Sequence, residues 1–306
     1  MNCRDCSYQP QILQVLAEHG DDYEAYESEE KLTWCTGCGN FGIQNALKRA
    51  LTLEGFGPTD VLQCFDIGCN GNGSDKIHGY TLHGLHGRVL PIAAGAALAN
   101  TKMKVVASAG DGATFSEGVN HLVHAIRNDY PLLFIIHNNE NYGLTTGQPS
   151  ATTREGFVMN AAPEGVTTGP LNPMELILSL KPTFAARTFS GMVDHMTEIF
   201  RAGLKHRGLA IVEVMQICTT YNPATSHEWF WQRIRTTDEI KRYDKTDLWQ
   251  ARRVAEDLEE HISLGILYQD ETRPNFHERQ QRDGAKTGLV EEVRHRKISK
   301  LMKAFE

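Results

Sequence analysis

Long hydrophobic runs and a surplus of positive charge are both missing from this sequence of 306 residues. The longest apolar stretch, at 89–99, is too short to cross a bilayer, and the N-terminus lacks the hydrophobic core of a signal peptide. Acidic residues (38) outnumber basic ones (31), and the resulting net charge of −7 argues against nucleic-acid binding. We therefore expect a cytoplasmic globular protein that binds neither membrane nor nucleic acid.

Cysteine is plentiful, and the seven copies form an odd number, which favours free thiols or metal ligands over a disulfide framework. Cys35 and Cys38 come just before a helix that we expect Asn40 to cap. Cys69 and Cys218 each follow a predicted strand, so loops at one edge of a sheet can bring four thiols together. Four thiolates suit either zinc or an iron–sulfur cluster, and the pattern does not choose between them.

The cysteines can also be grouped in other ways. Cys3, Cys6, Cys35 and Cys38 form a CxxC-x28-CxxC pattern typical of a zinc ribbon, although the spacer is long and acidic. Cys35 and Cys38 alone could form a redox dithiol. Cys64 lies inside a predicted strand, where we expect it to behave as a small buried hydrophobe.

From about residue 32, strand-like and helix-like segments alternate along the chain. The strand-like runs are at 60–68, 104–110, 132–138 and 209–217, and the helix-like ones at 43–55, 91–101, 116–129 and 192–208. This alternation predicts an α/β fold, an open and mostly parallel sheet with helices on both faces. We divide the chain into an N-terminal extension with a CxxC pair (1–31), an α/β domain (32–225) and a polar, largely helical C-terminal extension (226–306) that docks without a second core.

The strongest local pattern joins the ends of two predicted strands. GDG at 110–112 ends the first strand, and NNENYGLTTGQ at 138–148 follows the second. Ligands of open α/β sheets bind at the carboxyl ends of strands, where these residues would meet. Asp111, Asn139 and the backbone carbonyl of Asn141 would give Mg²⁺ three oxygen ligands, and a diphosphate and a water would complete an octahedron.

Glycine at position 112 would let the backbone approach the phosphates, and the N-terminus of the helix at 116–129 would add its amides. The pairing of GDG with NN resembles the thiamine-diphosphate-binding motif. The glycine-rich stretch at 68–76 does not match the GxGxxG fingerprint of NAD-binding proteins.

Several independent motifs occur in the order found in the β subunit of 2-oxoacid:ferredoxin oxidoreductases, and the chain resembles that family over roughly residues 32–278. The motifs are WCTGCGNFGIQNAL, DIGCNGNGSDK, HGLHGR, GDG with NNENYGLTTGQ, ICTTYNP with EWFWQR, and SLGILYQDETRPNF. The resemblance implies a thiamine-diphosphate-binding fold. It also implies that Cys35, Cys38, Cys69 and Cys218 carry one [4Fe-4S] cluster beside thiamine diphosphate, with Trp34 packed nearby.

The resemblance further implies which residues contact the coenzyme. Four would lie beside the thiazolium ring (Ile67, Gly68, Cys69, Asn70) and four around the diphosphate (Gly112, Ala113, Gly143, Leu144). His86 and Gly110 are two further expected cofactor contacts. His86, Arg88 and Asn72 are the candidate catalytic residues, with His83 as a weaker candidate, although Arg88 and His83 could equally be structural hydrogen-bonding residues.

The chain departs from its family at two of these positions. Several relatives have a substrate-binding lysine where this chain has Asn72, and Lys76 is the nearest replacement. Ala113 replaces an acidic residue common in the family and offers only its backbone. The first departure leaves the identity of the substrate open.

The reaction implied by the resemblance is the coenzyme A-dependent oxidative decarboxylation of a 2-oxoacid, 2-oxoglutarate or pyruvate, to acyl-CoA and CO₂. Electrons would pass one at a time through the cluster to ferredoxin. The glutamate that activates thiamine belongs to the α subunit in this family, so we expect an α or fused α–γ partner in an (αβ)₂ heterotetramer. The alternatives are a non-oxidative thiamine-dependent decarboxylase subunit and a zinc-stabilised binding module.

Overall fold

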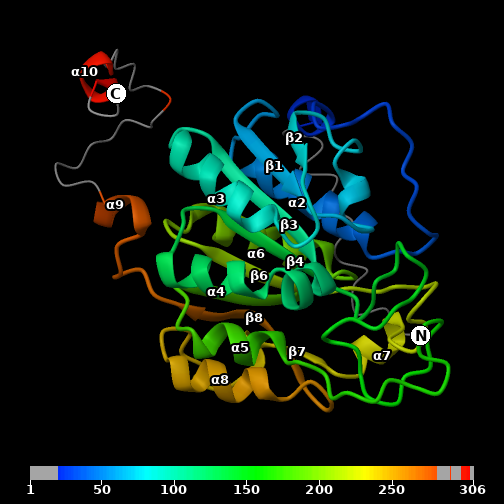
Figure 1. Ribbon diagram of the computed structural model, residues 1–306. Helices are drawn as coiled ribbons and strands as arrows, with labels where there is room; N and C mark the ends of the chain where they lie inside the picture. The colour runs from blue at the N-terminus through cyan, green and yellow to red at the C-terminus, as the bar shows by residue number, and fades with distance from the viewer. Residues whose placement is uncertain (1–19, 281–289, 291–297, 304–306) are drawn as a thin grey trace.

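Eight strands form one sheet in the computed structural model, which describes residues 20–280, 290 and 298–303 (Figure 1). In order across the sheet, the strands are β2 (Tyr80–His83), β1 (Val61–Phe65), β3 (Lys104–Gly110), β4 (Leu133–Asn138), β6 (Ala210–Met215), β5 (Phe184–Phe189), β8 (Ile262–Gln269) and β7 (Ile234–Thr236). The first six run parallel, β8 is antiparallel to β5, and β7 is parallel to β8. The prediction of an open, mostly parallel α/β sheet is confirmed.

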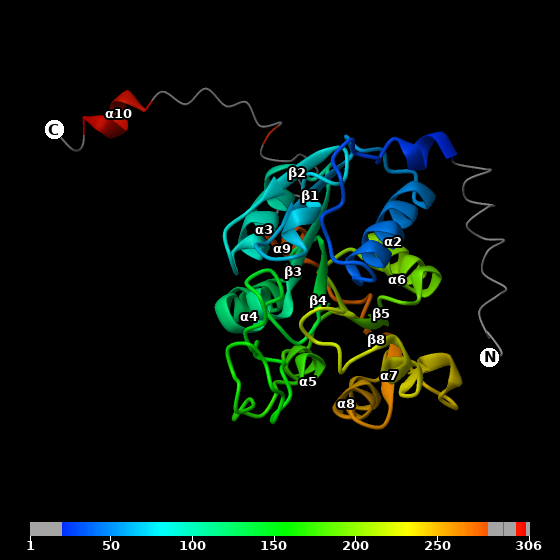
Figure 2. The same cartoon turned by 90° about the vertical axis from the view of Figure 1, so that its right-hand side faces the viewer.

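Helices cover both faces of this sheet (Figure 2). The described helices are α2 (Asn40–Leu53), α3 (Val89–Ala99), α4 (Val119–Asn128), α5 (Pro173–Ser179), α6 (Val193–Lys205), α7 (His227–Trp231), α8 (Leu248–Glu256), α9 (Phe276–Gln280) and α10 (Ser299–Met302). Of these, α10 lies away from the sheet (Figure 2). One apolar core lies under α2 and α6, and another under α3, α4, α5 and α8. In the described ranges, each helix is too short or too polar to traverse a bilayer.

Successive side chains of the central strands point alternately into these two cores. In β4, Leu133 and Ile135 belong to the core under α2 and α6, whereas Phe134 and Ile136 belong to the opposite one. Every residue of β4, β5 and β6 is buried, as expected for central strands of a parallel sheet. β5, which includes Arg187, was not among the predicted strands. Each buried aliphatic side chain contributes about 1.5–3 kcal/mol to folding.

The predicted segments correspond to β1, β3, β4 and β6 and to α2, α3, α4 and α6, with shorter bounds in most cases. The helix expected at 116–129 is divided in two. A π-helical turn spans Ala113–Glu117, and α4 begins only after Gly118. A Cβ atom at Gly118 would lie 2.8 Å from the carbonyl oxygen of Gly87, so this close backbone contact admits only glycine and interrupts the helix.

The C-terminal region differs from the largely helical extension that we expected. Its strand β8 pairs with β5 inside the main sheet, and Ala251 and Ala255 of α8 are fully buried in one of the two cores. The reason lies in the apolar run ISLGILY at 262–268, whose buried residues Ile262, Leu264 and Leu267 need the cover that the sheet provides. The N-terminal CxxC pair, Cys3 and Cys6, lies outside the described residues.

Candidate cofactor site

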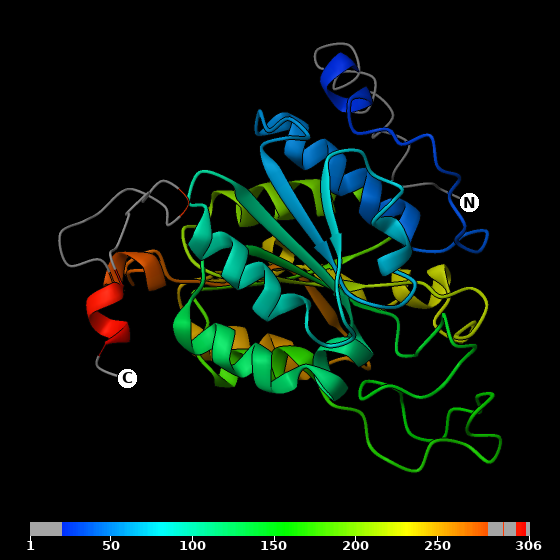
Figure 3. The same ribbon diagram turned by 45° about the horizontal axis from the view of Figure 1, so that its top comes forward.

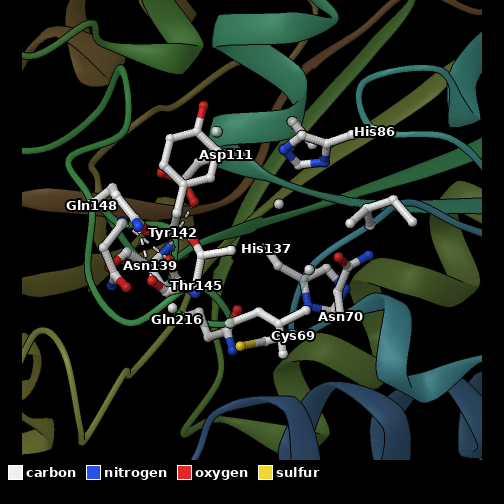
Figure 4. A pocket seen from close by; sticks show the side chains of 18 of the residues that line it. Cys69, Asn70, His86, Asp111, His137, Asn139, Tyr142, Thr145, Gln148 and Gln216 are labelled. Atoms are coloured by element: carbon white, nitrogen blue, oxygen red, sulfur yellow. Dashed lines mark hydrogen bonds between the residues drawn. The ribbon is translucent and has the colours of Figure 1, made fainter.

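The loops that follow β1, β3 and β4 lie at the carboxyl edge of the sheet (Figure 3). They enclose a cavity of about 390 Å³ (Figure 4). All ten residues predicted to contact the coenzyme line it: Ile67, Gly68, Cys69, Asn70, His86, Gly110, Gly112, Ala113, Gly143 and Leu144. The three predicted magnesium ligands line it too: Asp111, Asn139 and Asn141. Six further lining residues were not predicted: Glu117, His137, Tyr142, Thr145, Gln148 and Gln216.

Asp111 is the most deeply buried of the predicted magnesium ligands, with 1% of its surface exposed. Its Oδ2 atom accepts hydrogen bonds from Thr152 Oγ1 (2.6 Å) and Ser150 Oγ (2.5 Å). Its Oδ1 atom has only a long contact, 3.5 Å, with the backbone N–H of Asn139. Burial raises the pKa of Asp111 to about 6, against the opposing effect of the two hydroxyl groups. A nearby cation would favour the charged form, for which Oδ1 keeps free lone pairs.

The turn after β4 is fixed by its own asparagines. Asn139 Oδ1 accepts a hydrogen bond from the backbone N–H of Asn141 (3.1 Å), and Asn141 Nδ2 donates to the carbonyl of Asn139 (2.8 Å). Both residues are buried. The turn thus holds amide and carbonyl oxygens beside Asp111, and such hard oxygen ligands suit Mg²⁺. This set contains a single carboxylate, and no group of three or more His, Cys, Asp or Glu residues in the described ranges could hold a metal ion.

Tyr142 uses the space that glycine leaves at position 112. A Cβ atom on Gly112 would lie 2.3 Å from the Tyr142 ring, so this glycine is required by a side chain and not only by a phosphate. The Tyr142 hydroxyl donates to Glu117 (2.9 Å), and burial raises the pKa of Tyr142 to about 12. Figure 4 shows Tyr142 and His86 on either side of the cavity. His86 Nε2 lies 3.6 Å from Glu117.

A buried carboxylate holds the loop that carries His86. Asp66 is fully buried and accepts hydrogen bonds from His86 Nδ1 (3.1 Å), from the N–H of Gly87 (2.9 Å) and from the N–H of Val89 (3.2 Å). The loop therefore presents the Nε2 side of His86 toward Glu117. Asp66 itself gave no signal in the sequence beyond its position at the end of a strand.

The other catalytic candidates lie elsewhere. Arg88 donates to the carbonyl of Glu117 (2.7 Å) and is not among the residues that line the cavity. Asn72 lines a neighbouring cavity. Lys76, the possible replacement for the family lysine, is paired with Asp75 (3.0 Å) and lines neither cavity. Exposed His83 is also outside both.

The second cavity, of about 170 Å³, is lined by the four predicted cluster ligands: Cys35, Cys38, Cys69 and Cys218. Trp34 lines it as well and donates from Nε1 to the carbonyl of Cys69 (2.7 Å). Five residues line both cavities and are called here the shared wall: Cys69, Asn139, Gly143, Leu144 and Gln216. Gly143 lets two sulfurs approach it, because a Cβ atom there would lie 3.3 Å from Cys69 Sγ and 3.8 Å from Cys218 Sγ.

Backbone contacts bring distant parts of the chain together at the thiols. The N–H of Cys38 donates to the carbonyl of Cys35 (3.0 Å), and the N–H of Gly39 donates to the carbonyl of Ile217 (3.0 Å). Thr219 Oγ1 also donates to the carbonyl of Thr36 (3.0 Å). The loop before α2 is therefore tied to the loop after β6, as the grouping of Cys35, Cys38 and Cys218 requires.

The electrostatics of the thiols reflect their closeness. Burial, together with the neighbouring cysteines, raises the pKa of Cys69 to about 12, so this thiol is protonated at neutral pH when no metal is bound. Metal binding would release such protons. A zinc site would draw four sulfurs to within about 2.3 Å of one ion. In a [4Fe-4S] cluster each cysteine binds a different iron, which suits thiols that surround a space.

Asn40 does not cap α2 as predicted. Gly39 is the N-cap residue and makes no side-chain bond, while Asn40 is buried and its Oδ1 faces His137 Nδ1 (2.9 Å) and Gln216 Nε2 (3.0 Å). Burial lowers the pKa of His137 to about 3, so the ring is neutral, with its proton on Nδ1. Its Nε2 has no hydrogen-bond partner in the described part of the chain.

Gln216 connects this group to the thiols, because its Nε2 also lies 3.7 Å from Cys38 Sγ. The signal that could have identified His137 and Gln216 is the presence of a polar residue at the carboxyl end of an otherwise apolar strand.

Comparison with known families agrees with this geometry. Residues 66–214 match the family described as thiamine pyrophosphate enzyme, C-terminal TPP binding domain. Residues 218–283 match the family described as the C-terminal part of the pyruvate ferredoxin oxidoreductase beta subunit. The two matches are separated by residues 215–217, a stretch that includes Gln216 of the shared wall.

Individual relatives give the same result. The chain is 35% identical over 257 residues to the 2-oxoacid:ferredoxin oxidoreductase subunit beta of Saccharolobus solfataricus, covering 80% of this chain and 84% of the relative. It is 36% identical to the 2-oxoglutarate oxidoreductase subunit KorB of Mycobacterium tuberculosis, covering 64% and 53%. A solved structure of 2-oxoglutarate:ferredoxin oxidoreductase from Magnetococcus marinus matches with a TM-score of 0.83 and 28% identity, covering 93% and 96%.

Proposed function

Because the chain belongs to the family of 2-oxoacid:ferredoxin oxidoreductase β subunits, we propose that it is the coenzyme-binding subunit of such an oxidoreductase. The reaction is the coenzyme A-dependent oxidative decarboxylation of a 2-oxoacid to acyl-CoA and CO₂, with ferredoxin as electron acceptor. Between the two substrates that the sequence left open, 2-oxoglutarate is favoured over pyruvate, because several relatives and the similar structure are named for it.

One observation carries this proposal. A cavity lined by every predicted coenzyme contact shares a wall with a cavity lined by all four predicted cluster cysteines. A binding module stabilised by zinc has no need of the first cavity, and a non-oxidative decarboxylase has no need of the second. An enzyme that takes electrons from a coenzyme-bound substrate needs both, side by side.

The residues around the first cavity fit thiamine diphosphate with Mg²⁺. Bound there, the coenzyme supplies the carbon nucleophile and the electron sink that decarboxylation requires. Asp111, Asn139 and the carbonyl of Asn141 hold the ion, and Ser150 and Thr152 keep the carboxylate of Asp111 in place. Because the surrounding walls are largely apolar, they exclude water from the reacting centre.

His86 has the geometry of a residue that holds or moves a proton. Asp66 accepts from its Nδ1 and keeps Nε2 toward the cavity and Glu117. That arrangement orients an imidazole at the place where a substrate carboxylate or a departing proton needs a partner. Arg88 supports the site by donating a hydrogen bond to the carbonyl of Glu117. Asn72 lies beside the thiols in the second cavity.

The four cysteines that line the second cavity would hold a [4Fe-4S] cluster, which would supply a one-electron acceptor. Within the described residues their thiols surround a common space but are not drawn together into a metal site. Cys35, Cys38, Cys69 and Cys218 are the cluster ligands in this proposal. Cys69 belongs to the shared wall, so a cluster held by these cysteines would lie next to the first cavity and would supply an electron acceptor there.

A partner subunit is part of the proposal. Asp111 and Glu117 are the acidic residues that line the first cavity, and both are engaged, Asp111 with the hydroxyl groups and the proposed ion, and Glu117 with Tyr142. Neither can serve the aminopyrimidine of thiamine, so an α or fused α–γ subunit supplies that carboxylate in an (αβ)₂ assembly. The cytoplasmic location stays a prediction of the sequence.

The test is anaerobic co-purification of the chain with its α partner, followed by metal and coenzyme analysis and a panel of 2-oxoacids with a viologen dye. We expect iron and sulfide near four per chain, bound thiamine diphosphate, and reduction of the dye that depends on coenzyme A and is fastest with 2-oxoglutarate. Thiamine diphosphate without iron would favour the non-oxidative decarboxylase, and zinc without coenzyme would favour the binding module.

A further inference from the structure

A fully buried ion pair lies in the middle of the sheet, next to the candidate site. Arg187 of β5 and Glu213 of β6 face each other in the strand register, and Arg187 Nε donates to Glu213 Oε2 (2.7 Å). Both side chains are 0% exposed. Two further guanidinium nitrogens of Arg187, Nη1 and Nη2, have no hydrogen-bond partner among the described residues.

Burying such an ion pair in the core costs desolvation free energy. Removing two charges from water costs several kcal/mol per ion, and replacing a buried pair by apolar residues of similar volume is often neutral or stabilising. The unpartnered guanidinium nitrogens make this pair less favourable still. Stability alone therefore gives no reason for Arg187 and Glu213 to be charged, and a role in the site is the better explanation.

A continuous chain of hydrogen bonds connects the pair to Asp111. Glu213 Oε1 accepts from Asn138 Nδ2 (2.8 Å). Asn138 Oδ1 lies 3.1 Å from Thr152 Oγ1, and the same hydroxyl lies 2.6 Å from Asp111 Oδ2. Asn138, Thr152 and Asp111 are each at most 4% exposed, so water does not compete with these contacts.

The donor and acceptor roles along this series of hydrogen bonds follow from the chemistry of each group. Glu213 can only accept, so it takes the NH₂ end of the Asn138 amide and turns the carbonyl end toward Thr152. The hydroxyl hydrogen of Thr152 is then held between two acceptors, Asn138 Oδ1 and Asp111 Oδ2. Asn138 also directly precedes Asn139, so the oriented amide lies next in the chain to a second member of the proposed magnesium set.

We propose that Arg187 and Glu213 are positioning residues that orient Asn138 and, through Thr152, fix the Asp111 carboxylate for Mg²⁺–thiamine diphosphate. Arg187 holds the Glu213 carboxylate in place through its Nε atom, and Glu213 sets the direction of the amide. The inference rests on the proposed function and concerns residues of this chain alone.

The test compares two double variants of the chain in complex with its α partner. R187M/E213L removes the charges and the acceptor, whereas R187M/E213Q removes the charges and keeps an oxygen that can accept from Asn138. The affinity for Mg²⁺ is measured by titration in the presence of thiamine diphosphate, and stability by urea unfolding of the same samples. The control is R201M, which breaks the pair between Arg201 and Glu54 (2.7 Å) at helices α6 and α2.

We expect R187M/E213L to weaken Mg²⁺ binding by about tenfold, at the low end of what substitutions behind the metal ligands cost, and R187M/E213Q to restore most of it. R201M should bind Mg²⁺ as the wild type does. A purely structural pair would predict equal losses in both double variants or in the control, and either result would overturn the proposal, as would wild-type affinity in R187M/E213L.

Two single variants keep the proposal testable if R187M/E213L does not fold. N138A leaves the ion pair intact, and T152V removes the hydroxyl that contacts Asp111. Because Asn138 and Thr152 act through the same series of hydrogen bonds, the double variant N138A/T152V should lose no more Mg²⁺ affinity than T152V alone. Additive losses, or wild-type affinity in N138A, would overturn the positioning role. If the wild-type complex itself does not bind Mg²⁺–thiamine diphosphate, the proposed function has failed and this inference with it.

Discussion

The two halves of the candidate site are built in different ways. The oxygen half, with Asp111, Asn139 and Asn141, lies directly at strand ends, is at most 8% exposed and is joined by internal hydrogen bonds. The thiol half is mostly on loops, where Cys35 is exposed, Cys38 and Cys69 are half-buried, and only Cys218 is buried.

This difference has a physical consequence. The sheet holds the oxygen half in shape without any ligand, because its side chains already satisfy one another. Burial raises the pKa of Cys38 and of Cys69, so these two thiols hold their protons when no metal is bound. Metal binding would release those protons and must supply part of the order of the thiol half. We therefore expect the two halves to fail separately when single residues are changed, and three predictions test that separation.

The largest effect is expected for D111A. Substitutions of residues that only support a metal ligand cost about 10–100-fold in metal affinity, so loss of the carboxylate ligand itself should weaken Mg²⁺–thiamine diphosphate binding by more than about a hundredfold. Iron content should stay at the wild-type level, because the thiol half does not use Asp111. Coenzyme binding is measured by titration and iron by colorimetric assay.

The control for D111A is D75A, which removes a surface carboxylate paired with Lys76. Unchanged coenzyme affinity in D111A would refute the magnesium assignment. Loss of iron together with the coenzyme would show that the two halves are not separable.

The converse variant is C218S, which we expect to lose the cluster and bind thiamine diphosphate within a few-fold of the wild type. A serine hydroxyl is a poor ligand for iron, and Cys218 is the only proposed ligand after β6. C64S is the matched control, since Cys64 is buried in β1 and should leave the iron content unchanged. Full iron content in C218S, measured with the visible absorption of the anaerobic complex, would contradict the ligand set.

The smallest effect concerns His137, which lies between the two halves. Burial lowers its pKa to about 3, below the value of about 6.5 expected in the unfolded chain. The unfolded state therefore takes up a proton first as the pH falls, and stability is lost progressively from about pH 6.5 toward pH 3. H137Q cannot titrate, and its amide can still donate to Asn40.

The measurement for His137 is the free energy of unfolding of the metal-free chain at pH 7 and pH 5. Between these two values the wild type should lose about 2 kcal/mol relative to H137Q. Taking the difference between the proteins removes the contribution of Asp111, whose raised pKa acts in the opposite direction. Parallel pH profiles would mean that His137 is hydrated in the native chain.

The sequence predicted the parallel core of the fold because β1, β3, β4 and β6 are largely buried and therefore mostly apolar. The sequence did not predict β8, because its apolar run lies inside a polar, charged region. The run is identifiable as a strand only from its pairing with β5. The residues that line the first cavity could be predicted because the motifs follow strand ends, which topology brings to one edge.

The residues that support the site could not be predicted in the same way. Ser150 and Thr152 follow an irregular turn, and only the folded chain brings their hydroxyl groups to Asp111. Asn40 looks like a helix cap in the sequence, but the tertiary contact with His137 takes its side chain instead. Contacts between residues far apart in the chain leave no local pattern.

The shared wall has a consequence for anyone who wishes to redesign this protein. Leu144 and Gln216 face both cavities, so a substitution that enlarges the first cavity for a bulkier substrate also changes the surroundings of the sulfurs. In the proposed enzyme, substrate range and the reduction potential of the cluster would therefore be coupled traits. Directed evolution on either one will need compensating changes on the other, and libraries that vary both faces together should outperform libraries that vary one.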